Sequence, residues 1–513
     1  MQRLLPVQPA VRLAVFLVVL SFAALLFHRP AKNADFQEYG LMTIALAEHG
    51  SPGIRLADVE IANRLSPEPA FVSLHAQLRA GMERGEQMPF PGFVRGKDGS
   101  YYAIHFFAYS ALAVLPFKFI DALGGQPFKA FQVVNLAALA VLAVAMFRLS
   151  GSCGRAVFGI LFFLLSGGVL YADWASTEFF SACSLLAGLL FVVLGRPYLG
   201  AVLAGVAAMQ NPPLLFFSLF APLIRVCHMY AHERVSPGTA WRKVMDRHTV
   251  MASLLQAALA LAPLLYNLAV LGIPSPIAAM STNPDLITGA RLLSFYFDLN
   301  QGMIIGFPVA LALVAVQLVA QDRRWLPHTL TAVLFSLALA LPSLSTVNWN
   351  SGASGMMRYA FWGGMPLLYL ALTWMQRVPR WPLALLAALL LVQVVAIKHA
   401  RSYVYVEFSP AARTMLRLFP ALYTPDPEIF IERVLHVDGA MHQDAVATYG
   451  LPGRPVKSVF NTGSAAAHAA LCGPGARVVL PAGGTGDPGD PGGWRYVDGK
   501  PVCTPSVAPA LHP

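Results

Sequence analysis

The sequence predicts an all-α polytopic membrane protein, and three observations lead to this fold class. Only 12% of the 513 residues are charged and 56% are hydrophobic, whereas soluble proteins carry about 25% charged residues. The mean hydropathy is +0.58, and several apolar runs approach the roughly 20 residues that span a bilayer. These runs do not alternate with a period of two, as barrel strands do. We expect about 10–12 transmembrane or re-entrant helices.

Nine apolar runs are predicted to cross the membrane as regular helices. The first has a basic flank in Arg3 and Arg12, but the following HRPAKNADF contains no A-x-A cleavage site, so an uncleaved anchor is favoured over a signal peptide. The runs are residues 11–27, 131–148, 155–171, 177–195, 250–272, 302–320, 327–345, 358–376 and 381–398.

Two further apolar stretches are less regular. Residues 103–120 either span the membrane or lie along its interface. Residues 198–224 are interrupted by MQNPPL, and Pro212 and Pro213 cannot continue a helical hydrogen-bond ladder. Such breaks are tolerated at membrane depth where the backbone is buried in protein or lines a cavity. We therefore predict two short helices that meet at Asn211–Pro213.

The distribution of basic residues predicts the orientation, because short cytoplasmic loops are rich in Arg and Lys. With a cytoplasmic N-terminus, and with residues 103–120 returning to the side from which they came, the basic loops all face inside. The short outside loops then contain only Arg291 and Arg358. The inside set is Arg148, Arg155, Arg196, Arg225, Arg234, Arg242, Lys243, Arg247, Arg323, Arg324, Arg377 and Arg380. The net charge of +10 thus indicates topology rather than a nucleic-acid partner.

This threading predicts a transmembrane domain over residues 1–398 and two larger regions outside. One is the first outer loop, residues 28–102, with amphipathic helices. The other is a small outer, periplasmic region over residues 399–513, rich in Gly and Pro, which is either a small domain or a partly disordered appendage. In an oxidising compartment Cys472 and Cys503 either pair or remain as two free thiols. The membrane is predicted to be the inner (plasma) membrane, with membrane lipids as partners.

Polar motifs converge on the outer side in this arrangement, whereas the inner loops are merely basic. Each motif also has an ordinary structural interpretation: Asp35 and Glu38 fit a capping box for a helix that ends before Gly50, and Arg358 fits a residue that snorkels to head groups. Together they offer carboxylates, a guanidinium and many hydroxyl and amide groups at the depth of a lipid-linked phosphate. The motifs are NADFQEY (33–39), DWASTE (173–178), MQNPPL (209–214), FDLNQG (297–302) and NWNSGASGMMRY (348–359).

Several stretches resemble segments of the GT-C superfamily of membrane glycosyltransferases, which includes the protein mannosyltransferases and the lipid A aminoarabinose transferases. The resemblance covers roughly residues 10–400 and indicates a divergent bacterial member. It rests on an acidic stretch that opens a large first outer loop, an aromatic-rich segment, a polar outer turn, a small-residue helix with a polar tip, and an outer tail. The first four are DFQEYGLMTIALAEHGSP, YYAIHFFAYSALAVLPFKFIDALGG, YADWASTEFFSACSLLAGLL and YLGAVLAGVAAMQNPPLLFF.

The resemblance implies an inverting transferase that moves a sugar from a polyprenyl-phosphate donor to a lipid, glycan or protein acceptor of the envelope. Asp35 is the candidate base that removes the acceptor proton, and Glu38 orients Asp35 or binds the acceptor. Positive charge must receive the lipid phosphate, and the forked guanidinium of Arg358 suits it best. The remaining candidates for substrate binding are Lys97, Tyr102, His105, Asp173, Glu178, Asn211, Asn300 and Asn350.

Other possibilities stay open at this point. The family's second acid is replaced by Phe36, so a bridging Mg²⁺ or Mn²⁺ is possible without being required. His49, His75 and His105 lack the tight spacing of zinc ligands. A lipid or solute flippase is the rival class, since transporters also contain broken helices, although we find no internal repeat. A third class is a non-catalytic subunit for envelope assembly. The sugar and the acceptor are not specified by the sequence.

Overall fold

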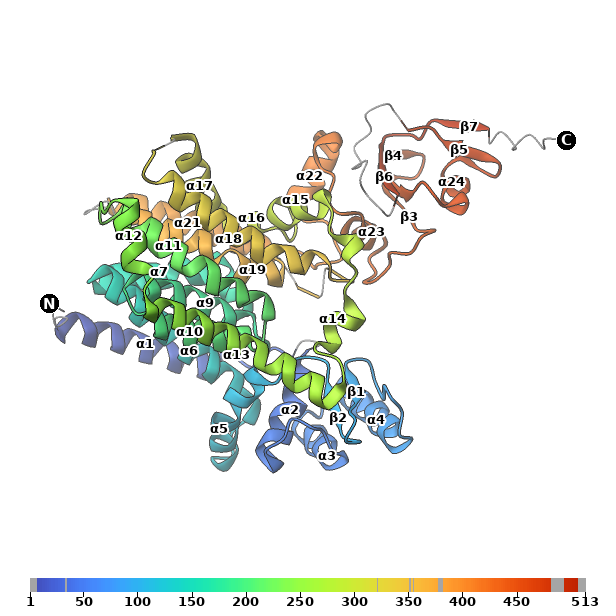
Figure 1. Ribbon diagram of the computed structural model, residues 1–513. Coiled ribbons are helices and arrows are strands. Elements are labelled where there is room, and N and C mark those ends of the chain that lie inside the picture. Colours follow the sequence, from blue (N-terminus) through green and yellow to red (C-terminus); the bar gives the residue numbers. More distant parts are fainter. Residues whose placement is uncertain are drawn as a thin grey trace. The chain divides into compact units, whose positions relative to one another are not determined.

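A computed structural model describes residues 7–32, 35–320, 322–349, 352–353, 355–376, 382–480 and 493–505 (Figure 1). Within these residues, seven helices are long and apolar enough to cross a membrane. The chain is therefore a multi-pass helical membrane protein. These helices are α1 (Val7–Phe27), α6 (Ala130–Ser150), α7 (Cys153–Phe163) with η2 (Leu164–Gly168) and α8 (Val169–Tyr171), η3 (Pro212–Phe216) with α11 (Phe217–Ala231), α13 (Arg247–Leu271), α18 (Leu326–Leu344) and α21 (Leu383–Ala400).

Shorter apolar helices complete the predicted set, and two predicted spans are interrupted. The 302–320 run divides at Phe307, and the 358–376 run divides at Gly364. The predicted break near Asn211 is confirmed, because one helix ends at Ala208 and the next turn begins at Pro212. The elements are α9 (Glu178–Val193), α10 (Pro197–Ala208), α16 (Met303–Gly306), α17 (Pro308–Ala320), α19 (Arg358–Gly363) and α20 (Met365–Met375).

The stretch 103–120 contains a helix that is too short to cross a bilayer upright. This helix, α5 (Ala108–Ala122), has 15 residues and is thus about 22 Å long, against roughly 30 Å of hydrocarbon. It packs with α2 and α6 and lies beside the segments that follow α1 (Figure 1). Its length favours a return to the side from which the chain came.

The chain divides into two compact units, and the first contains most of the apolar helices. It consists of Met1–Met280, Val309–Leu339 and Phe361–Gln393. Every residue of α9 is buried, so this helix is the centre of the unit. Gly188 of α9 and Gly200 of α10 let the two backbones approach closely, since a Cβ on Gly200 would lie 2.7 Å from the Gly188 carbonyl oxygen. Small residues commonly allow such packing in membranes.

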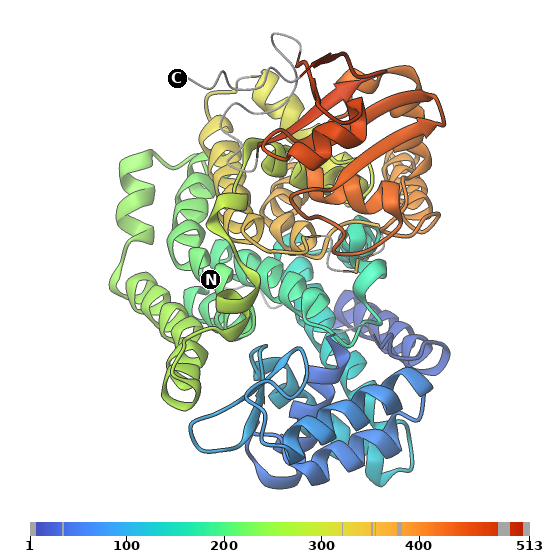
Figure 2. The same ribbon diagram turned by 90° about the vertical axis from the view of Figure 1, so that its right-hand side faces the viewer.

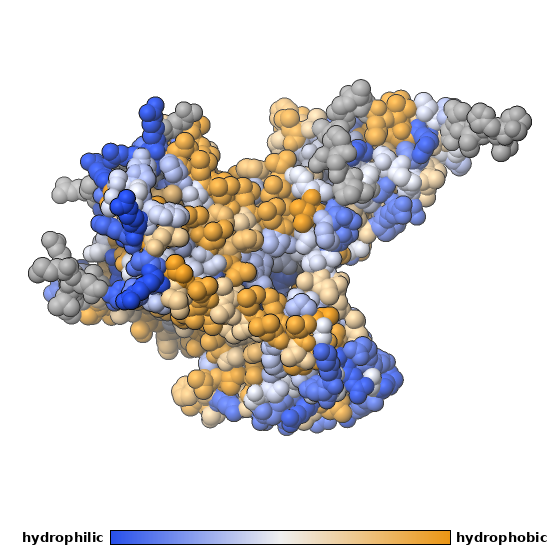
Figure 3. Space-filling view, viewed as in Figure 1, coloured by the Kyte–Doolittle hydropathy of each residue, from blue (hydrophilic) through white to orange (hydrophobic). Residues whose placement is uncertain are grey.

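The peripheral helices of this unit present exposed apolar side chains. Only 6% of the α1 span and 22% of the α13 span are buried within the protein. Figure 3 shows an apolar band over α10 and α13, and hydrophilic residues gathered at the end of the unit where α12 (Pro237–Val244) lies. Exposed apolar surface of this extent is typical of a membrane-embedded face.

The segment between α1 and α6 folds into short helices and one hairpin. Asp35 occupies the N-cap position of the first helix, but its side chain makes no capping hydrogen bond, and Glu38 instead contacts His105. The capping-box interpretation is therefore wrong, whereas the predicted helix end is confirmed by Gly50 with a φ of +69°. The elements are α2 (Phe36–His49), α3 (Leu56–Leu65), α4 (Pro69–Glu83), the antiparallel β1 (Phe93–Arg95) and β2 (Tyr101–Ala103), α5, and η1 (Pro127–Lys129).

The second unit joins the C-terminal region to two earlier segments, Ser281–Pro308 and Ala340–Ala360. Its antiparallel sheet has the order β3-β4-β6, and β5 pairs with β7 (Figure 2). A disulfide joins Cys472 to Cys503. The helix α14 (Pro276–Ser281) leads into this unit and ends at its first residue. The remaining elements are η4 (Pro284–Leu286), α15 (Gly289–Phe297), α22 (Pro410–Leu418), η5 (Pro420–Leu422), α23 (Pro427–Leu435), β3 (Val446–Leu451), β4 (Arg454–Asn461), α24 (Ala465–Cys472), β5 (Ala476–Val478), β6 (Trp494–Asp498) and β7 (Cys503–Pro505).

Buried ion pairs hold the two earlier segments to the C-terminal region. The Arg433 guanidinium donates to both carboxylate oxygens of Asp298, at 2.8 and 2.9 Å. Arg291 pairs with Asp426 and Glu428. Arg291 is only 1% exposed, so it is a structural ion-pair partner and not one of the exposed loop charges that determine topology.

Candidate functional site

The first turn of α2 places a carboxylate against a histidine from the segment before α5. Glu38 Oε2 lies 2.7 Å from His105 Nδ1 and also accepts the His105 backbone N–H at 3.2 Å. An ionised carboxylate only accepts hydrogen bonds, so Nδ1 carries the proton in this pair. Gly92 covers the carboxylate, because a Cβ there would lie 2.8 Å from Glu38 Oε1. Asp35 lies one turn earlier and is half-buried.

A chain of buried hydrogen bonds continues from α2 into the bundle. Gln210 donates to the Tyr39 hydroxyl at 3.4 Å and accepts from the Tyr109 backbone N–H at 3.1 Å. The Tyr109 hydroxyl donates to Asn135 at 3.1 Å, and Asn135 donates to the Ala172 carbonyl at 3.2 Å. This chain joins two of the predicted outer motifs, NADFQEY through Tyr39 and MQNPPL through Gln210, to α5 and α6. A third motif, DWASTE, is reached by the bond from Asn135 to the Trp174 carbonyl at 3.4 Å.

The DWASTE turn and the broken helix tip join the same region. Asn211 donates to Ser181 at 2.7 Å and to Thr177 at 3.3 Å. Glu178 is buried at the first position of α9, and after burial itself its charge raises the pKa of the Tyr109 hydroxyl. The Asp173 carbonyl accepts the Ala31 backbone N–H at 2.7 Å, which ties this turn to the segment just before Asp35.

Two predicted substrate residues on the hairpin have structural partners elsewhere. The Lys97 ammonium donates to the Leu268 carbonyl at 3.3 Å, and the Lys97 backbone N–H donates to Val270. It therefore caps the carboxyl end of α13, where positive charge is favourable. The Tyr102 hydroxyl donates to Asp98 at 2.7 Å, and burial and this bond raise the pKa of Tyr102. Neither side chain belongs to the Glu38 network.

The three remaining candidates lie in other parts of the chain. Arg358, in the second unit, is 8% exposed and has its guanidinium 5.8 Å from the ring centroid of Tyr359. Asn300, also in the second unit, is fully buried, and its amide bonds the backbone of Glu407 and Ser409. This gives Asn300 a structural role. Asn350 lies outside the described residues.

Sequence reasoning missed Gln37, which stands between the two acids of α2. It is 4% exposed, and within the described chain neither its amide nitrogen nor its amide oxygen has a hydrogen-bond partner. Buried polar groups are nearly always paired, with ordered water or a ligand where protein offers nothing. The amide of Gln37 is therefore a candidate contact for a polar ligand or an ordered water. Gln37 lies within the NADFQEY motif, but its burial depends on tertiary packing and could not be predicted from the motif alone.

His49 and His75, two of the histidines considered as metal ligands, have other surroundings in the described part of the chain. Within the residues that the structure describes, no three His, Cys, Asp or Glu side chains are grouped to hold an ion. His49 lies 3.0 Å from Asp58. Burial, followed by the charge of Lys32, lowers the pKa of His75 to about 4, so His75 is neutral at pH 7.

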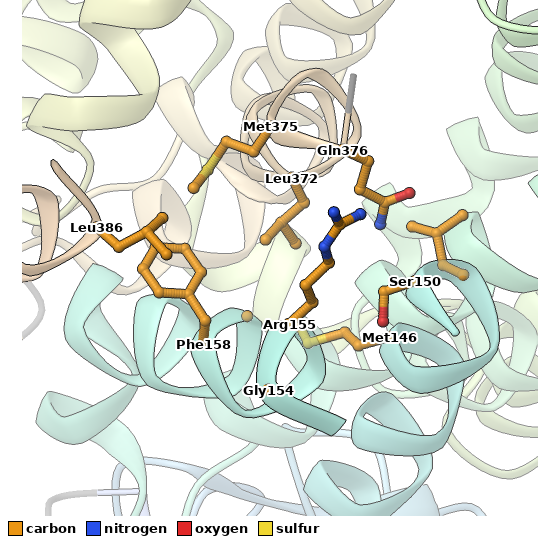
Figure 4. Close-up of a pocket in the computed structure, with 11 residues that line it drawn as sticks. Met146, Ser150, Gly154, Arg155, Phe158, Leu372, Met375, Gln376 and Leu386 are labelled. Carbon is orange, nitrogen blue, oxygen red and sulfur yellow. The ribbon is translucent and has the colours of Figure 1, made fainter. Parts of the chain in front are cut away.

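An apolar cavity of about 310 Å³ opens elsewhere in the first unit, between α6, α7, α20 and α21 (Figure 4). Figure 4 shows Phe158, Leu372, Met375 and Leu386 around it, with Arg155 among its few polar groups. The described residues that line it include no carboxylate, so they offer no acidic general base. The better candidate for chemistry is the α2 region, where the Glu38–His105 pair lies beside the hydrogen-bond chain that starts at Tyr39.

Comparisons with known proteins do not place the chain in a family. No protein-family model, no curated protein and no solved structure matches this sequence.

Proposed function

We propose that this protein is a GT-C-like glycosyltransferase of the bacterial inner membrane. It transfers a sugar from a polyprenyl phosphate to a lipid, glycan or protein acceptor on the outer face, with inversion at the anomeric carbon. One observation carries the proposal. Polar segments that are predicted to face outside, and that are spread over residues 31–211 of the sequence, are joined by the Tyr39–Gln210–Tyr109–Asn135 hydrogen bonds. Four candidate carboxylates, Asp35, Glu38, Asp173 and Glu178, belong to or directly follow segments that these bonds join. Ionisable groups near a membrane are functional hypotheses by default.

In this proposal Asp35 is the general base that takes the acceptor proton as the hydroxyl attacks. Asp35 is half-buried rather than enclosed, which leaves it within reach of an acceptor. The position of His105 is fixed by Glu38 through two hydrogen bonds, and in this proposal its imidazole is one of the groups that receive the leaving phosphate. Asp173, Glu178, Asn211 and the amide of Gln37 are proposed to meet the sugar hydroxyls. Arg358 as a phosphate ligand stays a prediction from the sequence.

Orientation follows the basic loops: the N-terminus is cytoplasmic and the C-terminal region periplasmic. In the first unit the hydrophilic end around α12 includes Arg242 and Lys243, which supports a cytoplasmic assignment for that end. Cysteine-accessibility labelling from either side of sealed vesicles tests it. Labelling of a cysteine at Arg242 from the periplasmic side would overturn the orientation.

The decisive experiment is sugar transfer by the purified protein in lipid, with a panel of polyprenyl-phosphate sugars and envelope acceptors. We compare the wild type with Asp35→Asn and with the matched control Asp121→Asn, an exposed aspartate at the end of α5. Asp35→Asn should lose at least 100-fold in rate, since a general base contributes typically 10²–10⁴-fold, while donor binding persists and Asp121→Asn is unaffected. The product should show inverted anomeric configuration by NMR.

The same preparation separates the rival class. A flippase moves the labelled lipid-linked sugar across the bilayer without forming a new glycosidic bond. Translocation without transfer, or equal transfer by wild type and Asp35→Asn, contradicts the proposed mechanism.

A further inference from the structure

A large polar cavity lies within the second unit, far along the chain from the α2 network. It has a volume of about 950 Å³, near the upper end of the roughly 300–1,000 Å³ that ligand sites occupy. Its walls come from α22, the end of α23 and the β3–β4 hairpin. All of its lining residues lie between Glu407 and Val456, so the cavity belongs entirely to the C-terminal region.

Three arginines face this cavity without acidic partners. Arg413, Arg417 and Arg454 line it and are exposed, and within the described part of the chain none of them forms an ion pair. Arg413 and Arg417 are four residues apart on α22, a spacing at which like charges destabilise a helix. Glu407 is the one carboxylate in the lining, so positive charge exceeds negative. An anion bound between the arginines would remove this repulsion.

A fourth arginine of the lining is already occupied. Arg433 is fully buried and donates to both oxygens of Asp298. Its charge is thus neutralised within the protein, and it forms a rigid wall. The lining therefore contains one arginine that stabilises the fold and three arginines that face solvent.

The lining also suits a sugar ring, not only an anion. The Tyr449 ring packs edge-on against Phe408, with centroids 5.1 Å apart and an interplanar angle of 74°. This contact holds the half-buried Tyr449 ring at the cavity wall. Thr448 and His436 add hydroxyl and imidazole groups to the lining. Aromatic faces pack against the apolar face of a pyranose, while arginine forks bind phosphate or carboxylate oxygens with two parallel hydrogen bonds.

We propose that this cavity binds an anionic carbohydrate, a sugar chain that carries phosphate or carboxylate groups. The proposal that this carbohydrate binds is based on the cavity alone. Its identity as the acceptor of sugar transfer rests on the proposed function, and the C-terminal region then selects the acceptor by charge. Binding is measured without any donor, so a failure of the transferase proposal and a failure of this one are distinguishable.

The test uses the full-length protein in lipid nanodiscs and isothermal titration with matched probes. The carboxylate probe is oligogalacturonate, and its neutral control is the same oligosaccharide fully methyl-esterified. A phosphorylated oligomannose is the phosphate arm, and inorganic polyphosphate is an anion without sugar. The variants are Arg413→Gln with Arg417→Gln, Tyr449→Leu, and the control Arg477→Gln, an exposed arginine on β5 outside the cavity.

We expect at least one anionic oligosaccharide to bind and the esterified control to bind at least tenfold more weakly. The double arginine variant should lose tenfold or more, and more salt should weaken binding by the wild type. Tyr449→Leu should weaken the oligosaccharide but not polyphosphate, and Arg477→Gln should behave as wild type. The preferred charged probe tells carboxylated from phosphorylated ligands. Binding of neither anionic oligosaccharide, or equal loss in Arg477→Gln, overturns the proposal, and so does tight polyphosphate binding with no effect of Tyr449→Leu on either sugar probe.

Discussion

Replacing Arg433 by Met should destabilise the second unit strongly at pH 7. The change leaves the fully buried Asp298 carboxylate with the Tyr423 hydroxyl at 2.7 Å and two backbone N–H groups, but with no cation. Breaking a buried ion pair in this way costs about 3–5 kcal/mol. The alternative is protonation of Asp298, and from an ordinary pKa of about 3.9 this costs roughly 4 kcal/mol at pH 7. The two estimates agree, so we expect a loss near 4 kcal/mol.

Thermal unfolding in detergent measures this loss, with Arg477→Met as the control for an exposed arginine in the same unit. For a domain of 150–250 residues 1 kcal/mol shifts Tm by about 2–4 °C, so Arg433→Met should lower Tm by roughly 8–16 °C. The deficit should shrink by about 1.4 kcal/mol for each pH unit toward pH 5, because protonation becomes less costly. Adding Asp298→Asn should restore part of the stability. A Tm within about 2 °C of the control, or a deficit independent of pH, refutes the reasoning.

Three further results are expected. Gly200→Ala should destabilise the α9–α10 packing by about 1–3 kcal/mol, since its Cβ meets Gly188, whereas Gly238→Ala on α12 has open space and should be neutral or slightly stabilising; thermal unfolding that ranks them the other way contradicts this packing. Cys472→Ser opens a disulfide that spans 31 residues and should cost up to about 3–4 kcal/mol, seen as earlier proteolysis of the C-terminal region; unchanged proteolysis would mean that the disulfide adds little. Burial alone would raise the pKa of Asp298, but the charge of Arg433 outweighs burial and lowers this pKa. The stability that the pair contributes is therefore present above pH about 3.9 and is lost as the pH falls below that value. An acid titration in which stability is already lost near pH 6 would exclude this pair as the cause.

The membrane helices could be predicted from the sequence because lipid makes local composition decisive. A run such as 250–272 must be apolar over its whole length, and the structure places α13 at Arg247–Leu271. The break at Pro212 could equally be predicted from the sequence, since proline lacks the N–H that a helix needs at that position. The kink after Phe163 was not predicted, although Ser166 and Gly167, where the backbone leaves helical dihedral angles, are residue types at which helices often kink.

The partners of the polar residues could be predicted only in part. Glu38 and Asp35 fit a capping box by spacing, but the Glu38 carboxylate contacts His105, 67 residues away. Asn300 in FDLNQG offered the same polar signature as Asn211, yet its amide holds the Glu407–Ser409 backbone. One sequence shows which polar residues are near the membrane surface, and tertiary contacts decide which of them face a substrate.

The two units differ in how their polar side chains are paired. In the second unit two buried arginines are neutralised by carboxylates: Asp298 pairs with Arg433, and Asp426 pairs with Arg291. Breaking such a pair leaves an uncompensated buried charge, so these arginines are structural contacts. In the first unit the network around Glu38 is built mainly from amides, hydroxyls and one imidazole, and the amide of Gln37 has no partner among the described residues. A buried amide is costly unless water or a ligand pairs it, and Gln37 stands in the same helical turn as the carboxyl-bearing residues Asp35 and Glu38, so we expect chemistry at the start of α2.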